Sequence, residues 1–165
     1  MISSRTTSLL LLVALALTGC PTPSDAPFPE DYERSWREAR TPCTLSHDHE
    51  LRYIRVFTDD AAFEPYTRHE TPYPAGARLL KAEYDDAECT ELLSYVLMEK
   101  LEPGSGAPGE FDWSWRRFDP DRREVHDPRT IPFTCVDCHE WHCAEAPYGW
   151  DYTCTPGSPE PPSRR

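Results

Sequence analysis

The chain has 165 residues, of which 29 are Asp or Glu and 17 are Lys or Arg, and its formal net charge is −12. Hydrophobic residues make up 38% of the chain and aromatic residues 12%, which is enough for one packed domain of ordinary size. The excess of negative charge argues against binding to nucleic acid and against direct electrostatic docking on anionic lipid.

The first twenty residues, MISSRTTSLLLLVALALTGC, have the pattern of a secretory signal. Arg5 precedes an apolar run, Leu9 to Leu17, that is too short to span a bilayer. The run ends in LTGC, which resembles the bacterial lipobox, whose cysteine is acylated and becomes the first residue of the mature chain. We therefore expect residues 1–19 to be a lipoprotein signal peptide, with an ordinary signal peptide as the alternative. Lipid on Cys20 would anchor the protein to an inner or outer membrane, facing the periplasm or the cell surface.

Two proline-rich segments bound the rest of the chain. Residues 20–30 are predicted to be a polar tether, and residues 155–165, which lack apolar periodicity, a disordered tail. The region between them, residues 31–154, is expected to form a single domain.

Within this domain the sequence predicts two helices and four strands. Residues 30–39 are predicted to form a helix, since Tyr32 and Trp36 lie four residues apart on one helical face. Residues 50–58, ELRYIRVFT, have the β-branched and aromatic residues typical of a strand. A short helix over 59–66 is expected to open on an Asp cap and to stop before Pro65. Residues 76–84, 92–101 and 111–119 are predicted to be three more strands, so that the pattern alone indicates a strand-rich α+β domain.

The segment FTCVDCHEWHC, Phe133 to Cys143, carries the strongest chemical motif. Its spacing Cys135-x-x-Cys138-His139 is that of c-type haem attachment, in which two thiols add to the haem vinyl groups and the adjacent histidine binds iron. With Cys20 assigned to lipid, four of the seven cysteines remain. In an exported protein we expect them to form two disulfides, with three possible pairings among Cys43, Cys89, Cys143 and Cys154.

Two other readings of the motif are weaker. A structural zinc site usually takes two ligand pairs from separated segments, and His47 to His49 is the only candidate for a second pair. A thioredoxin-like redox pair needs a βαβ framework, whereas this chain is rich in strands. Haem attachment is therefore the favoured prediction.

The order of motifs along the chain resembles the cytochrome P460 family from Tyr32 to about Asp151. The resemblance rests on the segments YIRVF, AAFEPY, YPAGARLLKAEY, YVLMEKLEPG, DWSWRRF and CVDCH. The family's aromatic residue, glycine and lysine correspond to Tyr73, Gly76 and Lys81, and its Trp-x-aromatic strand to Trp113 and Trp115. The chain departs from the family pattern in its four extra cysteines, in the HEWHC stretch after the motif and in its lipobox.

The resemblance implies a small antiparallel β-sheet with flanking helices, commonly assembled as a homodimer. It implies one haem c group held by Cys135 and Cys138, with His139 as the axial iron ligand and an open distal face. It also implies that Lys81 is the lysine whose side-chain nitrogen bonds to the haem macrocycle. Such a link needs the neutral amine, which burial favours by lowering the lysine pKa.

Further residues are weaker candidates for distal or surrounding positions. The resemblance suggests Glu99 as a proton acceptor and Phe133 as a distal cap, with a solvent-facing role as the alternative for Glu99. One of Arg52 and Arg55 is expected to pair with a haem propionate, since strand alternation keeps both from facing one way. Met98 is expected to be a core residue rather than an iron ligand.

Two functions follow from the resemblance. The first is an enzyme that oxidises hydroxylamine, with or without nitric oxide, and passes electrons to a periplasmic acceptor. The second is a non-catalytic protein resembling cytochrome c-prime-beta that binds nitric oxide or carbon monoxide. A six-coordinate electron-transfer cytochrome, whose sixth ligand would be Met98 or one of His47, His49, His69 and His126, is the less favoured third.

Overall fold

The computed structural model describes residues 26–46, 49, 52–70, 72–106, 111–125, 133–147 and 149–154, with the backbone alone at 41, 42, 133 and 134. The expected signal peptide with Cys20, most of the tether, the tail and the side chain of Phe133 lie outside the described residues. In these described ranges, no helix is long and apolar enough to cross a membrane.

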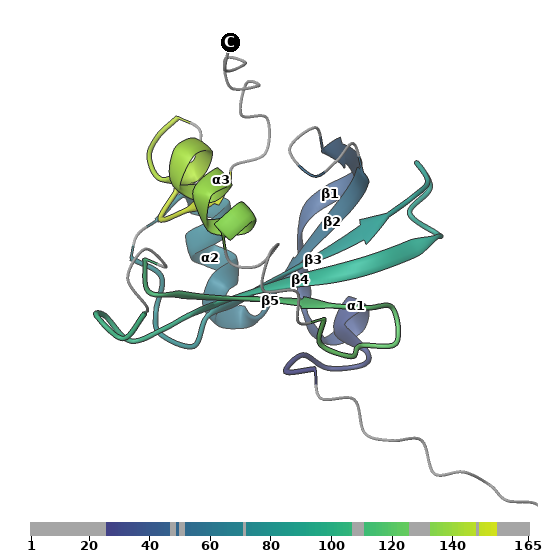
Figure 1. Cartoon of the computed structure of the whole chain (residues 1–165), viewed down its shortest axis with the longest axis horizontal. Helices are drawn as coiled ribbons and strands as arrows, with labels where there is room; N and C mark the ends of the chain where they lie inside the picture. The colour runs from purple at the N-terminus through teal and green to yellow at the C-terminus, as the bar shows by residue number, and fades with distance from the viewer. Residues whose placement is uncertain are drawn as a thin grey trace, which may run out of the picture.

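The centre of the fold is an antiparallel sheet in which each strand pairs with the next along the chain (Figure 1). In the described part of the chain its five strands are β1 (Arg37–Ser46), β2 (Arg52–Thr58), β3 (Arg78–Tyr84), β4 (Leu92–Lys100) and β5 (Trp113–Phe118). The helices are α1 (Tyr32–Ser35), α2 (Asp60–Arg68) and α3 (Phe133–Cys143), and a separate hairpin pairs β6 (Gly149–Trp150) with β7 (Thr153–Cys154). The predicted α+β fold, a small antiparallel sheet with flanking helices, is confirmed.

Side chains alternate along each strand and give the sheet two different faces. Helices α2 and α3 lie over one of them, the α3 face, and α1 lies over the other, the α1 face (Figure 1). The α3 face buries Ile54, Val56, Leu79, Met98, Trp113 and Trp115. The α1 face buries Phe57, Leu80, Tyr84, Tyr95, Leu97 and Phe118, with Phe28 and Tyr32 packed on them. A residue's place in this alternation therefore decides which layer it joins.

The prediction of a helix over 30–39 is largely wrong. Helix α1 ends at Ser35, Trp36 has extended dihedral angles, and the chain continues directly into β1. Pairing with β2 decides the conformation of this segment, although its residues have little strand propensity. The register of that pairing shifts between Arg40 and Thr44, around Pro42, whose nitrogen has no hydrogen to donate.

Helix α2 begins as predicted but runs further. The side chain of Asp59 caps it by accepting a hydrogen bond from the backbone N–H of Ala62 at 3.0 Å. The helix continues through Pro65 to Arg68 rather than stopping before the proline. Pro65 removes one backbone hydrogen bond and crowds the carbonyl four residues earlier, but the extra turn buries Tyr66 in the core on the α3 face.

A disulfide joins Cys43 of β1 to Cys89 in the turn between β3 and β4. It spans a sequence separation of 46 residues. Closing a loop of this length in the unfolded chain stabilises the fold by about 4 kcal/mol in the chain-entropy estimate. The edge strand β1 is thereby fastened to the centre of the sheet.

Candidate functional site

The cysteine–histidine motif lies on α3, which packs over the sheet (Figure 1). Cys135 and His139 are four residues apart and so lie on one side of the helix. Val136 and His139 are buried, whereas Asp137 and Glu140 are exposed. Cys135 and Cys138 keep their thiols, since neither belongs to a disulfide. The helix thus presents thiol and imidazole groups together near the α3 face.

His139 is held in one tautomer. Its Nδ1 lies 2.6 Å from the carbonyl oxygen of Tyr152. A carbonyl can only accept, so Nδ1 carries the proton and Nε2 keeps a lone pair. Burial, with a contribution from the charge of Lys81, lowers the pKa of His139 to about 3. The ring is therefore neutral at pH 7, with Nε2 able to act as a ligand.

Lys81 lies on the α3 face, in the middle of β3. It pairs in register with Val56 and Val96, and alternation puts it on the same face as Leu79 and Glu83. Its Nζ lies 3.0 Å from Nδ1 and 2.5 Å from Nε2 of His49. Burial lowers the pKa of Lys81, while the charge of Glu83 acts in the opposite direction. The amine is thereby shifted toward its neutral, nucleophilic form.

A buried carboxylate lies beside Lys81. Glu83 is only 3% exposed and accepts hydrogen bonds from Ser94 Oγ at 2.6 Å and from Arg117 Nη2 at 2.9 Å. Arg52 approaches the same carboxylate at 3.5 Å, as does Nδ1 of His49. One half of the α3 face is therefore polar, and in the described part of the chain the charges of Lys81, Arg52 and Arg117 gather around the carboxylate of Glu83.

The other half of the α3 face is apolar, apart from one buried hydrogen-bond donor on Trp115. Leu79, Met98 and Trp115 are buried there, and the edge of the Trp115 ring lies near His139, with 4.7 Å between ring centroids. Among the described residues, the buried indole N–H of Trp115 has no hydrogen-bond partner. A polar ligand atom or an ordered water at the site can satisfy a donor of this kind.

The structure brings some of the sequence-predicted residues together and separates others. Arg52 lies on the α3 face beside Glu83, whereas Arg55 lies on the α1 face and pairs with Glu38 and Glu33. Glu99, opposite Arg78 and Ser114, also lies on the α1 face, so it is not brought to Lys81 and His139. Strand alternation is the reason in both cases.

Met98 is buried among core residues of the α3 face, in agreement with its expected core role.

The four remaining cysteines form the pairs Cys43–Cys89 and Cys143–Cys154, which selects one of the three pairings that the sequence leaves open. The second pair ties the end of α3 to β7. His139, Cys143 and Cys154 lie close enough to hold a metal ion, but the two sulfurs are bonded to each other.

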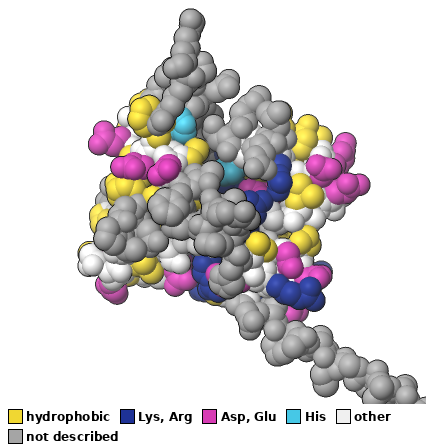
Figure 2. Space-filling view, viewed as in Figure 1, with side chains coloured by type: hydrophobic (Ala, Val, Ile, Leu, Met, Phe, Trp, Pro, Cys, Tyr) yellow, Lys and Arg dark blue, Asp and Glu magenta, His cyan; other side chains and the backbone are white. Residues whose placement is uncertain are grey.

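Sequence reasoning missed the roles of Glu83, Arg117 and Ser94, and it considered His49 only as a zinc or sixth iron ligand. Alternation from Lys81 could have identified Glu83 as a site residue. Arg117 and Ser94 become neighbours of Glu83 only through strand register. In the space-filling view, basic and acidic side chains lie together next to a histidine near the middle of the visible face (Figure 2).

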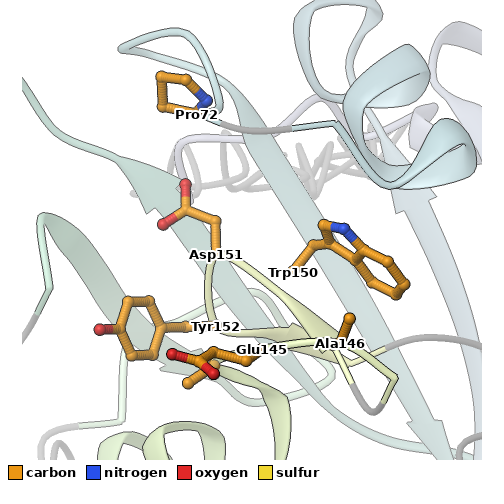
Figure 3. Close-up of a pocket in the computed structure, with 8 residues that line it drawn as sticks. Pro72, Glu145, Ala146, Trp150, Asp151 and Tyr152 are labelled. Carbon is orange, nitrogen blue, oxygen red and sulfur yellow. The ribbon is translucent and has the colours of Figure 1, made fainter.

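An open pocket lies separately, along the β6–β7 hairpin (Figure 3). Pro72, Glu145, Ala146, Trp150, Asp151 and Tyr152 are among its lining residues. Lys81 and Cys135 are not. The pocket therefore adjoins the segment that holds Nδ1 of His139, rather than the thiols or the amine.

Comparison with known proteins gives one result. A family model described as Cytochrome P460 matches residues 29–151, which is most of the chain and includes β1 to β5 and α3. No match is found among curated proteins.

Proposed function

The chain belongs to the cytochrome P460 family of haem proteins, and from this premise we propose that it is a mono-haem c-type cytochrome that oxidises hydroxylamine. We further propose that it is exported, is anchored to a membrane by lipid on Cys20, works as a homodimer and passes electrons to a periplasmic acceptor. The observation that carries the enzymatic proposal is the chemistry of Lys81. A partly buried lysine with a lowered pKa lies on the face over which the cysteine–histidine helix packs.

The residues fit a covalently attached haem. Cys135 and Cys138 supply two thiols for thioether bonds, and His139 is neutral with Nε2 free of its proton. The indole N–H of Trp115, which has no hydrogen-bond partner among the residues that the structure describes, suits a ring periphery that carries carboxylates. Arg52 and Arg117 offer positive charge on the same face, although both also interact with Glu83. When bound, the haem supplies an iron centre that accepts electrons from substrate nitrogen.

Lys81 is proposed to bond through Nζ to the haem macrocycle. Bond formation removes two protons and two electrons from the amine and a ring C–H, so an oxidant such as a peroxide is needed. The neutral imidazole of His49, whose pKa is lowered mainly by burial, touches Nζ and can take a hydrogen bond from the amine. This arrangement keeps the amine nitrogen's lone pair available.

The rest of the site would organise a small polar substrate. Oxidation of two hydroxylamine molecules to nitrous oxide and water releases four protons and four electrons. The carboxylate of Glu83, whose Oε1 lies 3.5 Å from Nδ1 of His49, would accept hydrogen bonds from the N–H and O–H groups of such a substrate. Leu79, Met98 and Trp115 exclude water from the other half of the face.

The test combines spectroscopy with turnover on the purified holoprotein. We expect a strongly red-shifted Soret band in the ferrous form, a haem peptide joined to the Lys81 peptide in mass spectra, and hydroxylamine oxidation with an artificial acceptor. His139→Ala should keep the covalent haem but lose the native iron ligand, and the electron paramagnetic resonance signal of the iron should change accordingly. An ordinary c-type spectrum, tight nitric oxide binding and no hydroxylamine turnover would instead support the gas-binding function.

A further inference from the structure

The β6–β7 hairpin that follows α3 is fastened to the end of that helix. Cys154 of β7 forms a disulfide with Cys143, the last residue of α3. Gly149 approaches the helix so closely that an added Cβ would lie 2.2 Å from the carbonyl oxygen of Cys143. Its N–H donates to the carbonyl of Glu145 at 3.1 Å. Only glycine fits at this contact, so hairpin and helix end form one unit.

The same hairpin is fastened to the sheet through Asp151. Its carboxylate pairs with Lys100 Nζ at 2.9 Å and accepts a hydrogen bond from the backbone N–H of Tyr73 at 3.3 Å. Its carbonyl oxygen accepts a hydrogen bond from Trp113 Nε1 at 3.0 Å. In Figure 3 the carboxylate of Asp151 projects from the hairpin toward the chain segment at Pro72. Asp151 is therefore held by three residues: Tyr73 before β3, Lys100 at the end of β4 and Trp113 at the start of β5.

The turn between β6 and β7 has an unfavourable backbone conformation at Tyr152. Trp150 pairs with Thr153, so Asp151 and Tyr152 form a two-residue turn, with φ of 48° and 64°. Turns of this type favour Asn, Asp or Gly at the first position and Gly at the second. Asp151 suits the first position, whereas Tyr152 holds a bulky side chain at positive φ in the second. Its carbonyl oxygen lies 2.6 Å from His139 Nδ1. Strain held by surrounding contacts is a recognised mark of functional positioning.

We propose that the β6–β7 hairpin is a positioning element for the axial histidine, with Asp151 and the Cys143–Cys154 disulfide as its two anchors. It fixes the hydrogen bond from Nδ1 of His139 to the Tyr152 carbonyl, and that bond strengthens electron donation from Nε2. The inference rests on the proposed role of His139 as the iron ligand. It goes beyond the region matched by the family model, which ends at residue 151, whereas Tyr152 and Cys154 follow it.

The first experiment compares two disulfide deletions in the holoprotein. Removal of Cys143–Cys154 by a double Cys→Ser change should move the iron–histidine stretching band of the ferrous protein to lower frequency and raise the midpoint potential. Removal of Cys43–Cys89 in the same way is the matched control, and it should lower thermal stability without moving either signal. Equal band positions and potentials in both variants would contradict the proposal.

A second pair of variants separates the Tyr152 carbonyl from its side chain, which stacks on Phe111. Tyr152→Gly and Tyr152→Val both lose the stacking, but glycine accepts positive φ and valine resists it. We expect the glycine variant to keep the original band position and the valine variant to shift it. If both shift alike, the side chain rather than the carbonyl is responsible, and the proposal fails.

These outcomes are independent of the reaction. A protein that binds nitric oxide without oxidising hydroxylamine would still show the predicted shifts, so the loss of the enzymatic proposal would leave this inference standing. Conversely, full hydroxylamine turnover with no spectral difference between the valine and glycine variants would overturn the inference and leave the enzymatic proposal standing.

Discussion

The carboxylate of Glu83 lies 2.9 Å from the guanidinium of Arg117 and two residues along β3 from Lys81. Glu83 contributes a buried negative charge beside the site lysine, and Arg117 partly compensates it. Burial lowers the pKa of Lys81 and the charge of Glu83 raises it, so the carboxylate limits how readily the amine loses its proton.

Replacing Glu83 with Gln should therefore have two effects. Arg117 and Arg52 lose their common partner, and because both guanidinium groups are partly exposed we expect a loss of about 2 kcal/mol in the free energy of unfolding. The pKa of Lys81 should fall further, which would allow the proposed haem link to form at lower pH. Urea denaturation and mass spectrometry of protein matured at several pH values measure the two effects.

Glu64→Gln is a suitable control for that change. Glu64 pairs with Arg68 on the surface, where the two side chains are 46% and 64% exposed. Its loss should cost less than about 0.5 kcal/mol and leave the haem peptide unchanged. A Glu83→Gln variant as stable as this control would show that the buried cluster contributes no net stability.

Lys81→Arg should abolish the proposed third covalent bond while keeping a positive charge on β3. The guanidinium remains protonated in proteins and is a poor nucleophile at this position. We expect the red shift of the ferrous Soret band and hydroxylamine turnover to disappear, with haem still bound to Cys135 and Cys138. Absorption spectra and peptide mass spectra check this. If the variant keeps the same red-shifted Soret band as the unmutated protein, Lys81 is excluded as the origin of the shift.

Double replacement of Cys135 and Cys138 by serine should remove covalent haem, because no thioether bond can form. Haem staining after denaturing electrophoresis provides the measurement, and the single variants should retain one bond each. Zinc bound in equal amount to the protein, with no haem absorption, would favour the alternative that the motif is a zinc site.

Alkaline pH should destabilise the fold through its buried tyrosines. Tyr32, Tyr84 and Tyr95 lie together on the α1 face, and burial raises the pKa of each above its usual value of 10.0. A raised folded-state pKa means that their contribution is fully present below pH 10 and is lost as pH rises above it, by at most about 1.4 kcal/mol per pH unit for each group. Tyr32→Phe should flatten this decline in urea titrations between pH 9 and 11. A slope unchanged from that of the unmutated protein would contradict the role of Tyr32.

Local patterns were sufficient wherever the deciding physics is local. Alternation along residues 76–84 is enough to place Leu79, Lys81 and Glu83 on one face, because a strand has a strict period of two. The cap at Asp59 was also predictable, since its side chain bonds to a backbone group three residues away. The Cys-x-x-Cys-His spacing indicates haem chemistry without reference to the fold.

Only the tertiary structure decided the remaining features, because each depends on residues far apart in the chain. Segment 37–46 is a strand through pairing with β2, which overrides its weak propensity. Sheet register and alternation separate Arg52 from Arg55 and exclude Glu99 from the site. Disulfide partners are fixed by proximity in the folded chain, and Tyr152 reaches His139 only because a strained turn is held by contacts with Lys100, Tyr73 and Trp113. A one-dimensional pattern carries the chemistry of single residues and their near neighbours, whereas the packing of the sheet against α3 determines which of those residues meet.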